Sequence, residues 1–156
     1  MIMSTEKFVY VIYIATTPEK VWRALIDGEL TRQYWGHANV SDWKPGADWK
    51  LVADDGQHTV HVVGRVVECV PNKRYVVTWA DPSDAADSSK HSGLAVDIEI
   101  VNDMTRVSVT HDQLTPEMQK KISNGWPRVL SSLKSFLETG RPLKVWAEPT
   151  NPESKR

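Results

Sequence analysis

The chain contains one long amphipathic helix pattern, close to its C-terminus, over about residues 115–139. Thr115, Pro116 and Glu117 favour a helix start, and Gly140 favours its end. The apolar residues recur at spacings of three and four, and they are Met118, Ile122, Trp126, Val129, Leu133 and Leu137. The preceding segment, 38–112, shows the patterns of strands and turns. A sheet must therefore cover this helix, and a sheet that curls around a single helix favours a cavity between them.

Length and composition exclude several classes of protein. The 156 residues are enough for one domain that buries roughly two thirds of its unfolded surface, and we expect a domain over 1–143 with a flexible tail over 144–156. Lys and Arg number 19 and Asp and Glu number 20, which gives a net charge of −1 without a basic run, so a nucleic-acid partner is not expected. Cys69 is the only cysteine, which excludes an internal disulfide and a thiolate zinc cluster and favours the cytoplasm.

The N-terminal residues do not have the pattern of a signal peptide, and no apolar run reaches the roughly 18 residues that a membrane span needs. We therefore expect neither secretion by signal peptide nor an association with a membrane.

The N-terminal third predicts a strand over residues 8–15 and then two short helices. Thr17 can cap the first helix and Pro18 fits its first turn, while Gly36 ends the second. Six further strands are predicted at 38–43, 48–53, 59–70, 74–80, 94–101 and 104–112. The polar segment 81–92 is predicted to be a mobile loop or lid.

Two hairpins have a predicted register. If Val101 pairs with Met104, the charged residues Glu99 and Arg106 face each other on the outer side. The same register brings together on the inner side Ile98 and Val107, Val96 and Val109, and Leu94 and His111. For the hairpin at Pro71, pairing of Val70 with Lys73 places Val66 opposite Val77 and Gly64 opposite Trp79, where a glycine would leave room for an indole.

In the long helix, Gly125 and Pro127 predict a bend over 123–127, because proline removes a hydrogen-bond donor and crowds the preceding turn.

An ordered set of short motifs matches a known family. These are Val21-Trp22, Trp35-Gly36, Pro45-Gly46, Gly64, Pro71 before Thr78-Trp79, Thr110-His111, Gly125-Trp126 and Leu137-Glu138-Thr139-Gly140. Over about residues 7–143 the chain resembles the bacterial proteins related to the C-terminal domain of the activator of Hsp90 ATPase, within the START-like (SRPBCC) helix-grip superfamily. The resemblance implies an α+β fold in which a curved seven-stranded antiparallel sheet surrounds the long C-terminal helix and encloses an apolar cavity. Relatives bind lipids, sterols, polyketides and other hydrophobic molecules, and a few are aromatase or cyclase enzymes.

Candidate residues for chemistry are few. His58 and His61 are three apart, so on one strand they face opposite sides and cannot share a metal ion. His111 is predicted to point inward, either as a hydrogen-bonded core histidine or as a ligand contact or acid/base group. Asp97 and Glu99 fall on the outer face, which favours a solvated ion-pair surface over a catalytic carboxylate pair.

We expect the cavity to be lined by aromatic residues from the strands, the second helix and the long helix, with a solid aromatic core as the alternative. The aromatic candidates are Trp35, Trp49, Tyr75, Trp79 and Trp126, and the others are Leu51, Val77, Val96, Ile98, Val109, His111, Ile122, Val129 and Leu133.

The leading hypothesis is a non-catalytic protein that binds a small hydrophobic molecule in this cavity, with no metal or cofactor. One alternative is a cyclase-, dehydratase- or hydrolase-like enzyme that uses His111 as general acid or base. Another is a protein-interaction role, either as a chaperone cofactor or as a homodimer that uses the sheet edge and Val145-Trp146.

Overall fold

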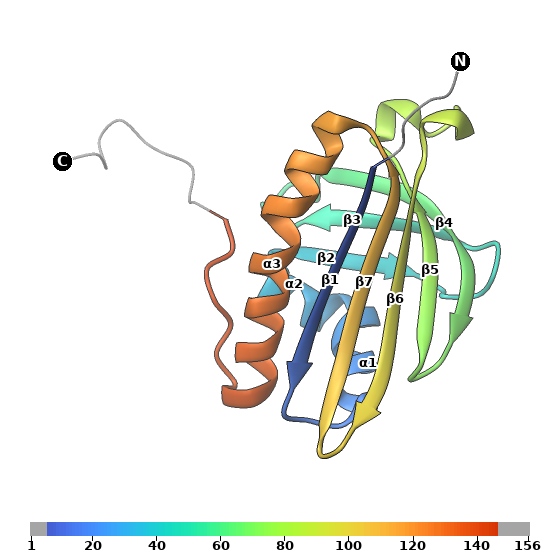
Figure 1. Ribbon diagram of the computed structural model, residues 1–156. Helices are drawn as coiled ribbons and strands as arrows, with labels where there is room; N and C mark the ends of the chain where they lie inside the picture. Colours follow the sequence, from blue (N-terminus) through green and yellow to red (C-terminus); the bar gives the residue numbers. More distant parts are fainter. Residues whose placement is uncertain (1–5, 147–156) are drawn as a thin grey trace.

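A seven-stranded antiparallel sheet curls around the long C-terminal helix, which is the predicted α+β helix-grip arrangement (Figure 1). The computed structural model describes residues 6–146. The strand order in the sheet is β1-β7-β6-β5-β4-β3-β2. The strands are β1 Glu6–Ile14, β2 His37–Ser41, β3 Asp48–Ala53, β4 Val60–Val70, β5 Arg74–Trp79, β6 Ser92–Val101 and β7 Met104–Leu114. The helices are α1 Pro18–Ile26, α2 Gly28–Trp35 and α3 Pro116–Thr139.

The helices begin and end where the sequence predicts. Thr17 Oγ1 accepts a hydrogen bond from the backbone N–H of Lys20, and Thr115 Oγ1 accepts one from Met118, which satisfies N–H groups at the starts of α1 and α3. Gly140 ends α3 with a φ of 79°, a left-handed conformation that glycine adopts without steric cost. α3 continues through Pro127 as one helix, and the bend at 123–127 stays a prediction.

The register predicted for the β6–β7 hairpin is confirmed. Val101 pairs with Met104, Glu99 with Arg106, and Leu94 with His111. The predicted outer charges form ion pairs, between Arg106 and Glu99 and between Arg74 and Asp97. The alternation of side chains along each strand therefore predicts correctly which face of this hairpin is buried and which is charged.

The register predicted for the β4–β5 hairpin is wrong at the turn. Val66 pairs with Val77 as predicted, but Val70 pairs with Arg74 instead of Lys73, because a bulge between Val66 and Glu68 shifts the register by one residue. The reason predicted for a glycine at position 64 is also wrong. A Cβ at Gly64 would lie 1.8 Å from the carbonyl oxygen of Thr78, so the glycine permits a close approach of two backbones.

The segment 81–92, predicted to be a mobile loop, instead forms two short 3₁₀ helices, η1 Pro82–Asp84 and η2 Ser88–Lys90. The carboxylates of Asp81 and Asp87 accept hydrogen bonds from backbone N–H groups at the starts of η1 and η2. This polar segment thus has defined local structure beside the end of β5.

The chain packs back onto the domain after α3, so the domain boundary predicted at residue 143 does not match the packing. Ser132 Oγ accepts a hydrogen bond from the backbone N–H of Leu143 at 2.9 Å. Val145 is buried, and Trp146 donates its indole N–H to the carbonyl oxygen of Trp35 at 2.7 Å. The predicted flexible tail includes residues 147–156, which lie outside the described residues. Within residues 6–146, no helix is both long and apolar enough to cross a membrane.

Candidate ligand-binding cavity

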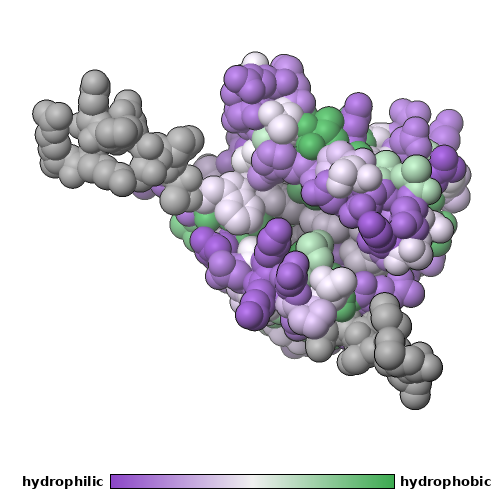
Figure 2. Space-filling view, turned by 90° about the horizontal axis from the view of Figure 1, so that it is seen from above, coloured by the Kyte–Doolittle hydropathy of each residue, from purple (hydrophilic) through white to green (hydrophobic). Residues whose placement is uncertain are grey.

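The surface near the start of α3 is hollowed, and the residues around the hollow are mostly hydrophilic (Figure 2). The cavity has a volume of about 700 Å³ and lies between α3, the end of α2, and strands β3 and β4. This volume is within the range of about 300–1,000 Å³ that is typical of small-molecule sites. The fold thus leaves space for a ligand between sheet and helix.

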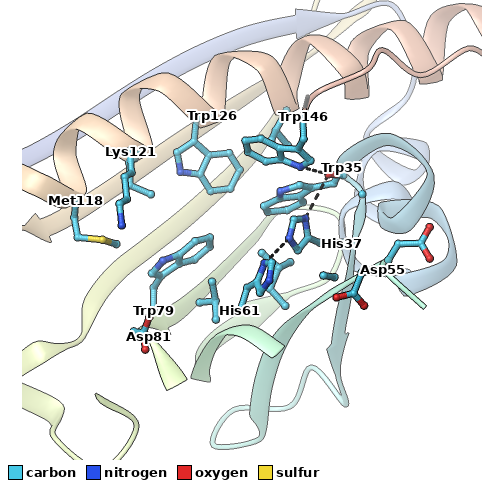
Figure 3. A pocket seen from close by; sticks show the side chains of 18 residues that line it. Trp35, His37, Asp55, His61, Trp79, Asp81, Met118, Lys121, Trp126 and Trp146 are labelled. Atoms are coloured by element: carbon cyan, nitrogen blue, oxygen red, sulfur yellow. Dashed lines mark hydrogen bonds between the residues drawn. The ribbon is translucent and has the colours of Figure 1, made fainter. Parts of the chain in front are cut away.

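Four tryptophans form much of the cavity wall (Figure 3). Trp35 is the last residue of α2, Trp79 ends β5, Trp126 lies on α3, and Trp146 comes from the C-terminal segment. The ring centroid of Trp126 is 5.2 Å from that of Trp35 and 6.1 Å from that of Trp79. Because the four residues come from separate parts of the chain, the tertiary fold alone brings them together.

The C-terminal Trp146 occupies space that two glycines leave free. A Cβ at Gly36 would lie 3.3 Å from Cδ1 of Trp146, and one at Gly125 would lie 3.6 Å from its Cη2. Trp146 also contacts the His37 ring edge-on and lies under the guanidinium of Arg128 at 5.6 Å. The glycines of the Trp-Gly and Gly-Trp motifs therefore leave room for the indole of Trp146 in the cavity wall.

Polar groups gather at the mouth of the cavity. Asp54, Asp55, Asp81 and Lys121 all line it. Hydrogen bonds from the Thr59 hydroxyl and the Gln57 backbone N–H lower the pKa of Asp55 to about 2. The backbone N–H and hydroxyl of Ser83 lower the pKa of Asp81. The mouth therefore carries ionised carboxylates at neutral pH.

Two histidines meet at the same mouth. His37 Nε2 lies 3.0 Å from His61 Nδ1, and His37 Nδ1 lies 3.5 Å from the carbonyl oxygen of Trp35. Burial is the largest cause that lowers the pKa of His37. Neither residue is among the cavity residues predicted from the sequence, in which the spacing of His61 relates it only to His58. The position of His37 directly after Trp35-Gly36 was the one sequence signal that could have pointed to it.

Six of the predicted cavity residues line the cavity: Trp35, Leu51, Trp79, Ile122, Trp126 and Val129. The other eight are buried elsewhere in the core: Trp49, Tyr75, Val77, Val96, Ile98, Val109, His111 and Leu133. The physical reason is visible at Tyr75, whose ring packs against Trp22 of α1 and against Trp43. Residues from α1 and from the loop after β2 thus cover one part of the concave face of the sheet. The cavity lies over the remaining part of that face.

His111 has the geometry of a hydrogen-bonded core histidine. Trp126 Nε1 donates to His111 Nδ1 at 3.3 Å, so the neutral ring carries its proton on Nε2, which lies 2.9 Å from Ser92 Oγ. Ser92 in turn donates to the carbonyl oxygen of Trp79. Burial lowers the pKa of His111 to about 4. Both ring nitrogens are thus engaged within the core.

The carboxylates and histidines around the cavity do not gather into a metal site. Across residues 6–146, no group of three or more His, Cys, Asp or Glu side chains is arranged to hold a metal ion. The wall of the cavity is mainly apolar, and the polar side chains that line the cavity lie at its mouth.

A curved antiparallel sheet that is closed by one long helix around an apolar cavity defines the helix-grip class of protein. The family model described as "Activator of Hsp90 ATPase homolog 1-like protein" matches residues 15–138, so the chain belongs to this family. No curated protein sequence matches the chain.

Solved structures share the fold at low sequence identity. An HSP90 activator from Plasmodium falciparum is 20% identical with a TM-score of 0.71, over 88% of this chain and 99% of that protein. The Aha1 dimer from Colwellia psychrerythraea is 24% identical with a TM-score of 0.69, over 86% of this chain and 98% of that one. CalU16 from Micromonospora echinospora is 19% identical with a TM-score of 0.71, over 89% and 78%.

Proposed function

We propose that this protein binds a small hydrophobic molecule in the cavity between the sheet and α3, without a chemical reaction. The observation that carries the proposal is an apolar cavity of about 700 Å³ with four tryptophans in its wall. A site of this kind obtains most of its affinity from apolar contact, and a few polar groups at the mouth fix the orientation of the ligand.

The surroundings of His111 support binding rather than catalysis. A general acid or base must reach a proton of the reacting molecule, and the His111 side chain is fully buried with both nitrogens hydrogen-bonded in the core. Under this proposal His111 stabilises the wall behind Trp126 and Trp79.

The neutral dye Nile red tests the proposal, because its fluorescence rises and shifts to the blue in an apolar site. We expect saturable binding to the wild-type protein and loss of binding in Val129→Trp, which places an indole inside the cavity. The matched control is Val67→Trp, on β4, because Val67 is an exposed residue outside the cavity. Circular dichroism verifies that both variants fold.

Two outcomes would count against the proposal. Absence of saturable Nile red binding to the wild-type protein would reject the cavity as a ligand site. Equal binding by the folded Val129→Trp variant would place the dye elsewhere on the molecule.

A second candidate function is an interaction with a chaperone of the Hsp90 type, which the family match favours. The outer face of the edge strand β1 exposes Val9, Val11 and Tyr13, an apolar row that a protein partner could cover. A pull-down with purified Hsp90 tests this candidate, with Val11→Lys as the variant that should abolish binding. Val145 is buried against its own chain, which disfavours the use of this residue in a homodimer interface that the sequence suggests.

A further inference from the structure

His61 reaches the cavity because of an irregularity in the sheet. Leu51 pairs with Val62 and the next residue, Val52, pairs with Val60, so His61 is an extra residue on β4 without a partner on β3. In a regular strand His61 and Val62 would point to opposite faces. Here both line the cavity, as expected if the bulge turns His61 toward it.

The hydrogen-bond partner of His61 is His37, which lies on β2, two strands away from β4 in the sheet. β2 and β4 flank β3, and alternate strands lie roughly 9–10 Å apart, a distance that two imidazole side chains can span together. Ala53 of β3 pairs with His37 and also lines the cavity. Its small side chain leaves room above β3 for the contact between His37 and His61 (Figure 3).

The hydrogen bonds determine where the protons of this pair lie. A carbonyl oxygen only accepts, so the contact with Trp35 places a proton on His37 Nδ1. In the neutral ring His37 Nε2 is then an acceptor, and the proton of the 3.0 Å contact belongs to His61 Nδ1. The remaining nitrogen, His61 Nε2, is left with a lone pair, and no residue within 6–146 hydrogen-bonds to it.

The charges around the mouth disfavour an anionic ligand. Three carboxylates, from Asp54, Asp55 and Asp81, line the cavity together with one cation, Lys121, so an anionic head group would be repelled. Each carboxylate already has a protein partner, in Arg32, Thr59 and Ser83 respectively. His61 lines the same cavity, and its Nε2 has no hydrogen-bond partner within residues 6–146.

We propose that the ligand of this cavity is an apolar ring compound with a hydroxyl group, a phenol or alcohol, and that His61 Nε2 accepts the hydrogen bond from this hydroxyl. This inference rests on the proposed function and specifies its ligand class. The hydroxyl extends a chain of hydrogen bonds that runs through His61 and His37 to the carbonyl of Trp35.

β-Naphthol and its methyl ether test the inference, because they share an apolar ring system and only the first can donate. We expect isothermal titration calorimetry to show that the wild-type protein binds β-naphthol about three- to tenfold more tightly than the ether, which is the usual contribution of one hydrogen bond. His61→Ala should abolish the preference and retain binding of the ether. The matched control is His58→Asn, because His58 lies outside the cavity and asparagine tolerates its φ of 56°.

The outcomes separate this inference from the proposed function. A preference for β-naphthol that is lost only in His61→Ala supports the inference. Equal affinity of the wild-type protein for both compounds, or a preference that persists in His61→Ala, overturns the inference and leaves the cavity as a binding site. If neither compound binds, the proposed function fails together with the inference.

Discussion

Replacement of Trp146 by alanine should destabilise the whole domain, although this residue lies outside the part of the chain that matches the family model. The substitution removes the hydrogen bond from the indole N–H to the carbonyl oxygen of Trp35 at the end of α2. It also removes the contact with the guanidinium of Arg128 and the packing beside Gly36 and Gly125.

The expected loss follows from these contacts. Trp146 is 39% exposed, so burial of the rest of its side chain contributes up to about 3 kcal/mol at the usual value per unit of apolar area. The hydrogen bond adds about 1 kcal/mol and the cation–π contact about 0.5 kcal/mol. Release of the C-terminal segment returns conformational entropy and offsets part of this sum. We expect a net loss of about 2–3 kcal/mol, which lowers the Tm of a protein of this size by roughly 5–10 °C.

Urea and thermal unfolding followed by circular dichroism measure this loss. Trp146→Phe keeps most of the apolar area without the donor, and it should lose only about 1 kcal/mol. The control is Leu143→Ala in the same segment, because the Leu143 side chain is half exposed and its backbone bonds to Ser132 are retained. A loss below about 0.5 kcal/mol for Trp146→Ala would show that the Trp146 side chain does not hold the C-terminal segment on the domain, since a change of that size is ordinary for a loosely attached surface residue.

Two other predictions concern the core. Gly64→Ala should destabilise the protein by more than about 3 kcal/mol in urea unfolding, because its Cβ would lie 1.8 Å from the Thr78 carbonyl oxygen. Gly125→Ala should be tolerated, since its new Cβ would lie 3.6 Å from its nearest neighbour, Cη2 of Trp146. Equal losses of unfolding free energy in the two variants would show that the close approach at Gly64 does not matter. The third variant, His111→Gln, removes a group whose folded pKa of about 4 is below the unfolded value of 6.5. The native state therefore binds fewer protons, and His111 should make stability fall as the pH decreases from 6.5 toward 4, by on the order of 3 kcal/mol. A wild-type stability profile that matches that of His111→Gln over this range would show that the buried imidazole has no such effect.

The sequence predicts this fold well where local rules act alone. In the β6–β7 hairpin, Asn102 has a φ of 56°, as a tight turn requires, and alternation then determines every pair from Val101–Met104 to Leu94–His111. The helix starts at Thr17 and Thr115 are likewise local, because the capping oxygen and the N–H group that it accepts from are three residues apart.

The β4 strand shows why other features were not predicted. Residues 60–70 are apolar on both faces, so alternation does not determine where an extra residue is inserted. The two bulges, at His61 and near Val67, therefore became visible only with the pairing partners on β3 and β5. The first of them brings His61 to the cavity mouth.

Only part of the cavity wall can be predicted from the sequence, because local patterns do not show which elements pack against each other. Inward orientation could be predicted for Tyr75 and Val96, but the sequence does not show which inward residues are covered by α1 and which face empty space. The contribution of Trp146 depends on the path of the chain after α3, which is held by long-range contacts to Ser132 and Trp35. Contacts of this kind are not encoded in local periodicity.

An apolar molecule that binds between the sheet and α3 must change the surroundings of the cavity indoles, and a nitrogen–proton correlation spectrum reports this change through their N–H signals. On titration with β-naphthol, we expect the signals of cavity tryptophans such as Trp35, Trp126 and Trp146 to shift in a saturable manner. The signals of Trp22 and Trp43, which lie outside the cavity wall, should stay in place. Absence of any saturable shift, or shifts confined to Trp22 and Trp43, would show that no apolar molecule binds in this cavity.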